Sequence, residues 1–291
     1  MRRLIIGCGY LGRRVAARWQ AAGDEVFALT RSNDRARELE DFGCRPILAD
    51  VTDVASLASL PNVDTVLHAV GYDRNAAPSK REVYVTGLTN VLDAVGDRSR
   101  QLIHISSTSV YAQQDGEIVD ETSECASIDE SGCICRDAEQ LVREFATAHQ
   151  RPACCILRLS GIYGPGRLLS RVEAIQAGAL MPGPRDSWLN LIHVDDAAAT
   201  VLACAERGQP GETYLVSDDR PVLRHEYYER LAELLSAPKP TFDESAVARH
   251  TRGRGKQCAN QKLRDVLQVE LQYPTIDAGL RHSLGRETER G

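Results

Sequence analysis

The sequence MRRLIIGCGYLG at residues 1–12 decides the fold, because a short apolar strand runs directly into a glycine-rich turn and then a helix. Gly7 allows a tight reversal of the chain, Gly9 lets the backbone approach a pyrophosphate, and Gly12 lets the helix lie close to the strand. The N–H groups at the start of that helix then face the phosphates. Apolar residues recur at helical spacing up to Gly23, which is the context that such a turn requires. We therefore expect a dinucleotide site here, rather than a turn that needs glycine only for its geometry.

Strands and helices are expected to alternate along the first half of the chain. The expected strands are the apolar segments 25–30, 45–49, 65–70, 101–106 and 153–159, and the expected helices are 33–42, 83–95 and 138–149. Nearly continuous apolar strands separated by helices are typical of a parallel sheet that is covered on both faces. The sequence therefore predicts an α/β fold built on a doubly wound parallel sheet.

The second half of the chain is expected to add a smaller lobe. Residues 1–160 are predicted to form the dinucleotide-binding domain, and residues 188–218 are predicted to return to it. The glycine- and proline-rich loops within 161–187 and the mostly helical tail 219–291 are expected to form a substrate-binding lobe beside a cleft.

Charge and hydropathy exclude several classes of partner. The 291-residue chain has a formal net charge of −6, which argues against nucleic acid or an anionic membrane surface as its partner. The basic run at 252–256 is interpreted as a solvated loop. No apolar run approaches the roughly 18 residues that a membrane span needs, and the apolar stretch after Arg2-Arg3 is too short for a signal peptide. We expect a cytoplasmic protein.

The nine cysteines do not have the spacing of a metal site or a disulfide framework. No Cys-x-x-Cys pair is present, and an odd number of cysteines in a reducing compartment favours free, mostly buried thiols. We expect no bound metal.

The end of the second strand indicates which nicotinamide coenzyme binds. An NAD-selective site places an acidic residue there to bind the ribose hydroxyls, whereas this chain has Thr30-Arg31-Ser32. A guanidinium grips a 2′-phosphate through paired, charge-assisted hydrogen bonds, and hydroxyls can add more. Arg31 and Ser32 therefore predict NADP(H) rather than NAD(H), with an arginine that merely solvates the strand end as the alternative.

Several further stretches occur in a recognisable order. They are ADVTD at 49–53, ISSTSVY at 105–111, RLSGIYGPGR at 158–167, NLIHVDD at 190–196 and LVSDDRP at 215–221. Together with the opening turn they resemble the short-chain dehydrogenase/reductase family, specifically its extended group of sugar-nucleotide epimerases and dehydratases. The opening Gly-x-Gly-x-x-Gly departs from that group's Gly-x-x-Gly-x-x-Gly, so the chain resembles an atypical branch. The resemblance implies a Rossmann fold.

The resemblance also implies contacts with the coenzyme and other partners. The implied coenzyme residues are Gly7, Gly9, Tyr10, Leu11 and Gly12 in the turn, Asp50 and Val51 beside the adenine, and the backbone of Ala69, Val70 and Gly71. Asp50 could instead cap its own loop. A sugar nucleotide is the implied substrate, with Tyr163, Arg167 and His193 as candidate contacts. By analogy alone, helices 83–95 and 138–149 could pair in a homodimer.

The catalytic residues of the family are incomplete in this sequence. The family uses a Ser or Thr after the fifth strand and a Tyr-x-x-x-Lys motif on the next helix, where tyrosine transfers the proton and lysine lowers its pKa. Ser107 matches the first position, but Ser131 and Cys135 stand where tyrosine and lysine belong. A serine hydroxyl is a far weaker acid than a phenol, and an ionised thiol has the opposite charge to an ammonium group.

Three interpretations follow. The first is an NADP(H)-dependent oxidoreductase or epimerase/dehydratase-like enzyme whose proton donor is Tyr111, Tyr163 or His193, with Tyr111 acting beside Ser107. The second is a catalytically inactive NADP(H)-binding sensor or regulatory protein. The third makes Cys133 or Cys135 a reactive thiol, because the start of a helix lowers a thiol pKa.

Each candidate also has a structural alternative. Tyr111 and Tyr163 could simply pack the cleft wall, and His193 could form a hydrogen bond within the core. Cys133 and Cys135 could fill space beside the coenzyme. Asp195 is interpreted as the N-cap of the helix that follows it.

Overall fold

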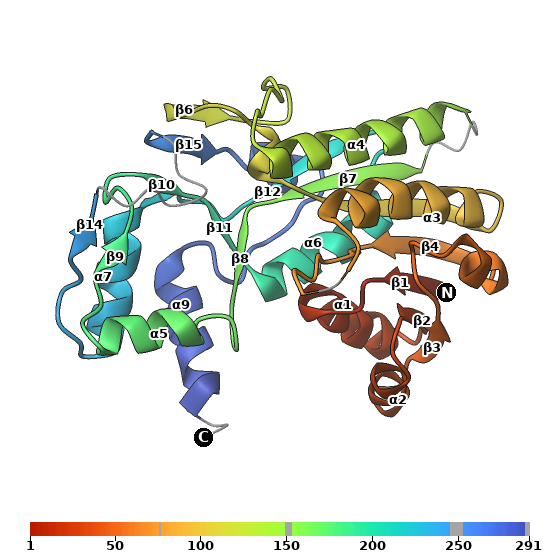
Figure 1. Ribbon diagram of the computed structural model, residues 1–291, viewed down its shortest axis with the longest axis horizontal. Helices are drawn as coiled ribbons and strands as arrows, with labels where there is room; N and C mark the ends of the chain where they lie inside the picture. The colour runs from red at the N-terminus through yellow and green to blue at the C-terminus, as the bar shows by residue number, and fades with distance from the viewer. Residues whose placement is uncertain (76, 149–152, 245–252, 289–291) are drawn as a thin grey trace.

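A seven-stranded parallel sheet organises the structure, which is a computed structural model that describes residues 1–75, 77–148, 153–244 and 253–288 (Figure 1). Its strands, in spatial order, are β12 (Thr213–Val216), β7 (Cys154–Leu159), β5 (Ser99–Ser107), β4 (Val63–His68), β1 (Arg2–Ile6), β2 (Glu25–Thr30) and β3 (Arg45–Leu48). Every neighbouring pair is parallel. The predicted doubly wound sheet is confirmed. The strand order reverses between β1 and β4, and ligands of such sheets bind in the crevice at this point.

Helices cover both faces of the sheet because each presents an apolar stripe to it. One face carries α1 (Tyr10–Ala21), α2 (Asn33–Asp41) and α6 (Val194–Arg207), and the other carries α3 (Gly87–Val95) and α4 (Glu130–Ala148) (Figure 1). In α3 the buried residues Leu88, Val91, Leu92 and Val95 recur at helical spacing. Two apolar cores result, one on each side of the sheet.

A second lobe lies beside the sheet and has its own apolar core (Figure 1). It contains the helices α5 (Leu169–Gln176), α7 (Arg224–Leu234) and α9 (Ile276–Thr288). It also contains two pairs of short strands: β9 (Met181–Pro182) pairs with β14 (Phe242–Asp243), and β10 (Trp188–Leu189) pairs with β13 (Val222–Leu223). The short strands β8 (Gly161–Tyr163) and β11 (Leu191–His193) pair with each other, and α8 (Gln261–Asp265) packs against β12. Of the predicted returning segment 188–218, only β12 joins the main sheet. The exact division into domains stays a prediction.

Three local expectations from the sequence are corrected. The helix predicted from Ala138 already begins at Glu130, so Ser131 and Cys135 lie in its first turns, and its predicted end at His149 falls outside the described residues. The predicted helix 83–95 opens with a π-helical turn, η2 (Glu82–Thr86).

The basic run 252–256 is the third correction. Its described part enters β15 (Gly255–Cys258), which pairs with β6 (Asp115–Val119), so this run is not a solvated loop. Two 3₁₀ turns, η1 (Val54–Ser59) and η3 (Thr108–Val110), complete the chain. No helix in the part of the chain that the structure describes is long and apolar enough to span a membrane.

Candidate functional site

The glycine-rich loop between β1 and α1 combines two structural glycines with one that faces open space. Gly7 has a φ of +97°, and a Cβ added there would lie 2.4 Å from the carbonyl oxygen of Ala69. A Cβ on Gly12 would lie 2.7 Å from the carbonyl oxygen of Gly7. By contrast, a Cβ on Gly9 would meet no atom within 4 Å. Gly7 and Gly12 therefore allow the backbone to pack closely, whereas Gly9 leaves room for a ligand.

A cavity of about 630 Å³ opens in front of this loop, in the size range of cofactor sites. Of the residues predicted to bind the coenzyme, the structure brings together Gly7, Gly9, Tyr10, Leu11, Gly12, Arg31, Asp50, Val51, Ala69, Val70 and Gly71 around it, and also Arg167. These residues come from the carboxyl ends of β1, β2 and β4 and from the segments that follow β3 and β8. The elongated set, with the N-terminus of α1 inside it, fits a dinucleotide.

The end of the cavity near β2 is basic. Arg31 is about half exposed at 48%, and its guanidinium Nη1 lies 3.9 Å from Asp50 Oδ2, so the side chain is only loosely paired. Ser32 does not line the cavity; its hydroxyl caps α2 by accepting a hydrogen bond from the backbone N–H of Arg35 at 3.3 Å.

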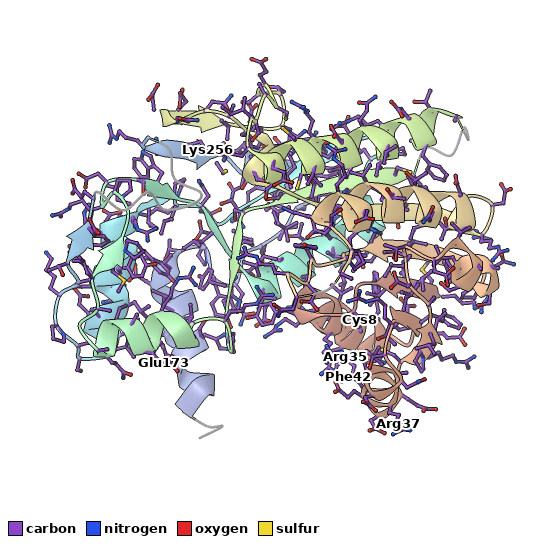
Figure 2. All side chains as sticks on the ribbon, viewed as in Figure 1. Cys8, Arg35, Arg37, Phe42, Glu173 and Lys256 are labelled. Carbon is purple, nitrogen blue, oxygen red and sulfur yellow. The ribbon has the colours of Figure 1, made fainter. Side chains whose placement is uncertain are left out.

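Arg35 lines the same end of the cavity and was missed by the sequence analysis. Figure 2 shows Arg35 near Cys8, which also lines the cavity. The available signal was its spacing, because Arg35 comes four residues after Arg31, in the first turn of the helix that follows the loop containing Arg31. Arg31 and Arg35 thus both line this end of the cavity, and Arg35 is also paired with Glu38 at 2.7 Å.

A smaller cavity of about 120 Å³ adjoins the inner end of the coenzyme cavity, since Ala69, Val70 and Ile105 line both. Ser107 lines this inner cavity, as does Tyr84 from the π-helical turn η2. The Ser107 hydroxyl accepts a hydrogen bond from the backbone N–H of Ser109 at 3.1 Å. The predicted position of Ser107 beside the coenzyme site is therefore compatible with the geometry, and its catalytic role stays a prediction.

Two buried histidines also line the inner cavity and were not singled out in the sequence. His68 ends β4 and pairs in register with His104 inside the adjacent strand β5, and their Nδ1 atoms are 3.1 Å apart. Burial lowers the pKa of His104 to about 4 and the pKa of His68 well below its usual value, so both rings are neutral at neutral pH. His68 Nε2 has no hydrogen-bond partner among the described residues.

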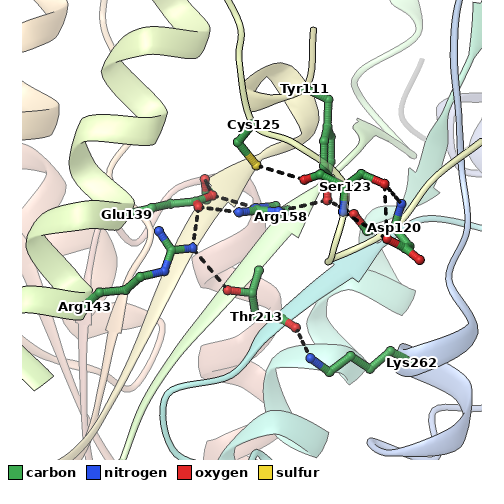
Figure 3. A network of polar contacts seen from close by, with 10 residues as sticks. Tyr111, Asp120, Ser123, Cys125, Glu139, Arg143, Arg158, Thr213 and Lys262 are labelled. Atoms are coloured by element: carbon green, nitrogen blue, oxygen red, sulfur yellow. Dashed lines mark hydrogen bonds and ion pairs between the residues drawn. The ribbon is translucent and has the colours of Figure 1, made fainter. Parts of the chain in front are cut away.

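Tyr111 lies in a buried network and lines neither of these two cavities (Figure 3). Its hydroxyl donates to the carbonyl oxygen of Asp120 at 2.7 Å and accepts from Arg158 Nη1 at 2.9 Å. Burial raises its pKa above the usual value, against the opposing effect of Arg158. The 3₁₀ turn η3 separates Tyr111 from Ser107 and directs it away. The structure thus does not bring the two predicted catalytic residues together.

The α4 residues that replace Tyr-x-x-x-Lys lie one turn apart. Cys135 lines the inner cavity, and its Sγ accepts a hydrogen bond from the hydroxyl of Ser109 at 3.7 Å. Burial raises the pKa of Cys135, so the thiol stays protonated at neutral pH. The Cys133 thiol donates to the carbonyl oxygen of Ser127 at 3.1 Å. These contacts agree with the space-filling alternative for both cysteines, and Ser131 lies farther out.

The three predicted substrate residues occupy different environments. Arg167 lines the coenzyme cavity, with its guanidinium 4.5 Å from the centre of the Tyr10 ring. Tyr163 is buried in the core of the second lobe, and its hydroxyl has no partner among the described residues. His193 is fully buried and packs edge-on against Tyr163. Only Arg167 is therefore placed at the cavity.

His193, rather than Asp195, is the N-cap of α6. Its Nδ1 accepts a hydrogen bond from the backbone N–H of Asp195 at 3.2 Å, and burial lowers its pKa to about 4. His193, Asp195 and His282 place atoms that could bind a metal ion within 4.8 Å of one another. The Asp195 carboxylate, however, already forms an ion pair with Arg14 Nε at 3.0 Å.

Comparison with known proteins identifies the family. The family model described as "NAD dependent epimerase/dehydratase family" matches residues 4–217. A 4-hydroxy-2-methyl-3-oxo-4-farnesyl-3,4-dihydroquinoline-1-oxide ketoreductase of Stigmatella aurantiaca is 29% identical over 231 residues, which are 74% of this chain and 67% of that protein. The short-chain dehydrogenase/reductase family 42E member 1 of Danio rerio is 28% identical over 271 residues, covering 81% of this chain and 68% of its own.

Solved structures show the same fold. A UDP-glucuronic acid 4-epimerase of Bacillus cereus, in complex with UDP-glucuronic acid and NAD, superposes with a TM-score of 0.82 at 17% identity and covers 100% of both chains. The family match extends from within β1 to the residue after β12 and so includes part or all of every strand of the parallel sheet. This chain therefore belongs to the NAD-dependent epimerase/dehydratase family, within the extended short-chain dehydrogenase/reductases, a family that binds NAD(P).

Proposed function

We propose that this protein uses NADP(H) to interconvert a carbonyl group and an alcohol on a small-molecule substrate. The observation that carries the proposal is the continuity of two cavities: one fits a dinucleotide and has Arg31 and Arg35 at its outer end, and the other holds Ser107 at its inner end. A coenzyme site that opens directly onto buried hydrogen-bonding groups is suited to redox chemistry on a polar substrate.

The residues around the cavity have separate tasks in this proposal. The N-terminal N–H groups of α1, beyond Gly9, bind the pyrophosphate, and Arg31 with Arg35 binds the 2′-phosphate. The backbone at Ala69–Gly71 lines the path to the inner cavity. The bound coenzyme supplies the hydride. Ser107 orients the substrate oxygen, and His68 Nε2 offers a further hydrogen bond in the same cavity.

The proposed substrate is a sugar nucleotide. The Bacillus cereus epimerase with the same fold binds UDP-glucuronic acid, and Arg167 places a cation where the coenzyme cavity meets the segment after β8. The Stigmatella relative is a ketoreductase of a dihydroquinoline, so aromatic ketones belong in the same substrate panel. The proposed homodimer through α3 and α4 is tested by size-exclusion chromatography with light scattering.

Two measurements test the proposed function. NADPH and NADH affinities are measured by calorimetry and by coenzyme fluorescence, and NADPH oxidation is then followed with a panel of UDP-sugars, aldehydes and ketones. We expect tighter NADPH binding and turnover of at least one carbonyl. Absence of coenzyme binding would contradict the proposal, whereas tight binding without turnover would favour a coenzyme-responsive regulatory protein.

Replacing Arg31 with alanine is expected to weaken NADPH binding by about 10- to 100-fold, because each hydrogen bond to a charged group contributes about 1.5–3 kcal/mol. NADH binding should change little, since NADH has no 2′-phosphate. Arg37→Ala is the matched control, because Arg37 is 80% exposed on the neighbouring helix α2 and does not line the cavity (Figure 2). Equal losses for both coenzymes would show that Arg31 does not select NADPH.

A further inference from the structure

The position that lacks the family's tyrosine and lysine is faced by another tyrosine and lysine. Lys80 and Tyr84 lie four residues apart at the start of the helix after β4, and this segment packs against α4. Tyr84 lines the inner cavity together with Ser107 and Cys135. It also lines a shallower adjoining cavity together with Lys80 and Ser131. A phenol and an ammonium group therefore lie beside both residues that replaced the usual pair.

The hydroxyl of Tyr84 is free to give up its proton. It accepts a hydrogen bond from the backbone N–H of Tyr72 at 3.2 Å, and within the described ranges no acceptor for its own proton is found. A hydrogen bond received by this oxygen stabilises the phenolate that would remain. Burial raises the pKa of Tyr84, and the Tyr72 N–H opposes this effect, so the phenol is protonated at neutral pH. It is then a proton donor beside Ser107.

Lys80 provides a positive charge next to this phenol. Its ammonium nitrogen lies 5.3 Å from the centre of the Tyr84 ring. Lys80 also acts on Cys135: burial raises the pKa of that thiol, whereas the charge of Lys80 lowers it. The cation therefore reaches the side of α4 where the family's lysine would lie, and it would stabilise a phenolate on Tyr84.

The backbone around Tyr84 is unusual in a way that supports a functional role. Tyr84 is the central residue of the π-helical turn η2 (Glu82–Thr86), which leads into the regular helix α3. π-Helical turns are rare and occur frequently at functional sites. In this chain the turn packs against α4 and contributes Tyr84 to the same inner cavity as Ser107.

We propose that Tyr84 is the proton-transferring residue of this protein and Lys80 its positioning cation, both supplied by the helix after β4 in place of α4. The inference rests on the proposed function. In carbonyl reduction the carbonyl carbon gains the hydride from NADPH, and the C=O π electrons move to oxygen. That oxygen takes the proton from Tyr84 Oη, and the resulting phenolate is reprotonated by water. Alcohol oxidation reverses each step.

The first test is spectroscopic and needs no substrate. The protein is labelled with carbon-13 at tyrosine Cζ, the Tyr84 resonance is assigned by its absence in Tyr84→Phe, and its pH titration is followed with and without NADP⁺. We expect NADP⁺ to shift this resonance and Lys80→Met to raise the pKa of Tyr84 by about 1. Lys239→Met is the control, because Lys239 is 70% exposed and paired with Glu229. The other titratable or charged groups that line the two cavities beside Tyr84 are His68, Tyr72, Arg74, His104, Glu130 and Cys135.

The second test is kinetic and uses the carbonyl of the panel that wild type reduces fastest. Tyr84→Phe is expected to lower kcat by at least about 100-fold, with NADPH affinity and thermal unfolding unchanged. Tyr111→Phe should retain most of the turnover, because its hydroxyl is occupied in the Arg158 network.

The outcomes separate the two proposals. Wild-type protein that binds neither coenzyme would contradict the proposed function. A Tyr84 resonance that responds neither to NADP⁺ nor to Lys80→Met would overturn the present inference. Turnover by Tyr84→Phe within about threefold of wild type would also overturn it. Neither of these two results would contradict the proposed binding of NADP(H). If Tyr84→Phe is unstable, the Tyr84 titration in Lys80→Met still tests the inference, because that variant leaves the phenol in place.

Discussion

Replacing Arg158 with methionine should lower the free energy of unfolding by about 3–5 kcal/mol, because it leaves a buried carboxylate without its main partner. Arg158 and Glu139 are 4% and 1% exposed, and Arg158 Nε and Nη2 bind the two carboxylate oxygens at 2.9 and 2.7 Å. The same guanidinium also holds the Tyr111 hydroxyl (Figure 3). The pair therefore joins α4 to β7 and to the loop that contains Tyr111.

Arg143→Met is the matched control for this prediction. Arg143 contacts the same carboxylate at 2.9 Å but is 39% exposed, so its loss should cost less than about 1 kcal/mol. Urea unfolding followed by circular dichroism measures both variants. Similar destabilisation by the two substitutions would show that burial does not decide the strength of these ion pairs.

The lowered pKa of Glu139 predicts how the stability of the fold depends on pH. Burial raises the pKa of Glu139, but the hydrogen bonds and charge of Arg158 outweigh this effect, so the folded-state pKa lies below its ordinary value. The carboxylate therefore contributes stability that is fully present above the unfolded pKa of about 4.3 and is lost as the pH falls through the folded pKa. Urea unfolding across this acidic range should show a smaller pH dependence in Glu139→Gln than in wild type.

Gly9→Val is expected to weaken the binding of both coenzymes by at least about 100-fold while the protein stays folded. A side chain there would extend into the space that the pyrophosphate requires, and a Cβ at Gly9 meets no protein atom within 4 Å. Calorimetry with NADPH measures the loss, and thermal unfolding without ligand checks the fold.

Gly7→Ala is the informative comparison within the same loop. Its Cβ would lie 2.4 Å from the carbonyl oxygen of Ala69, and its φ of +97° is unfavourable for alanine. This variant should lose stability even without coenzyme. A stable Gly7→Ala, or a Gly9→Val that binds NADPH normally, would contradict the roles assigned to the loop.

The sheet and the coenzyme cavity could be predicted because their signals are local in sequence. Each strand of the parallel sheet is a short apolar run, and the topology carries the residues after each run to one edge of the sheet. Gly9 was identified from the turn itself, whereas Asp50 and Ala69 were implied by the resemblance to the family, and the structure places all three around one cavity. Their roles in binding stay predictions, as does the preference for NADP(H).

The proton donor could not be found in this way because it depends on packing between elements distant in sequence. The family pattern places the phenol on α4, and Tyr111 is close to Ser107 in sequence, whereas Tyr84 lines the inner cavity from the helix after β4. Tyr111 was a candidate proton donor because it is close to Ser107 in sequence. The 3₁₀ turn between them, however, directs the Tyr111 side chain towards Arg158. The sequence contains Lys80 and Tyr84 in the order Lys-x-x-x-Tyr, but no local pattern indicates that this segment packs against α4.

Tyr10 limits where the two lobes can hinge. Its ring contacts the guanidinium groups of Arg14 and Arg167, which lie 4.3 and 4.5 Å from the ring centre, and its hydroxyl donates to the carbonyl oxygen of Pro165 at 3.0 Å. These contacts fasten the segment after β8 to the first helix. Any rotation of the second lobe that keeps these contacts would have to pivot beyond Arg167, so they hold this wall of the coenzyme cavity to the first helix.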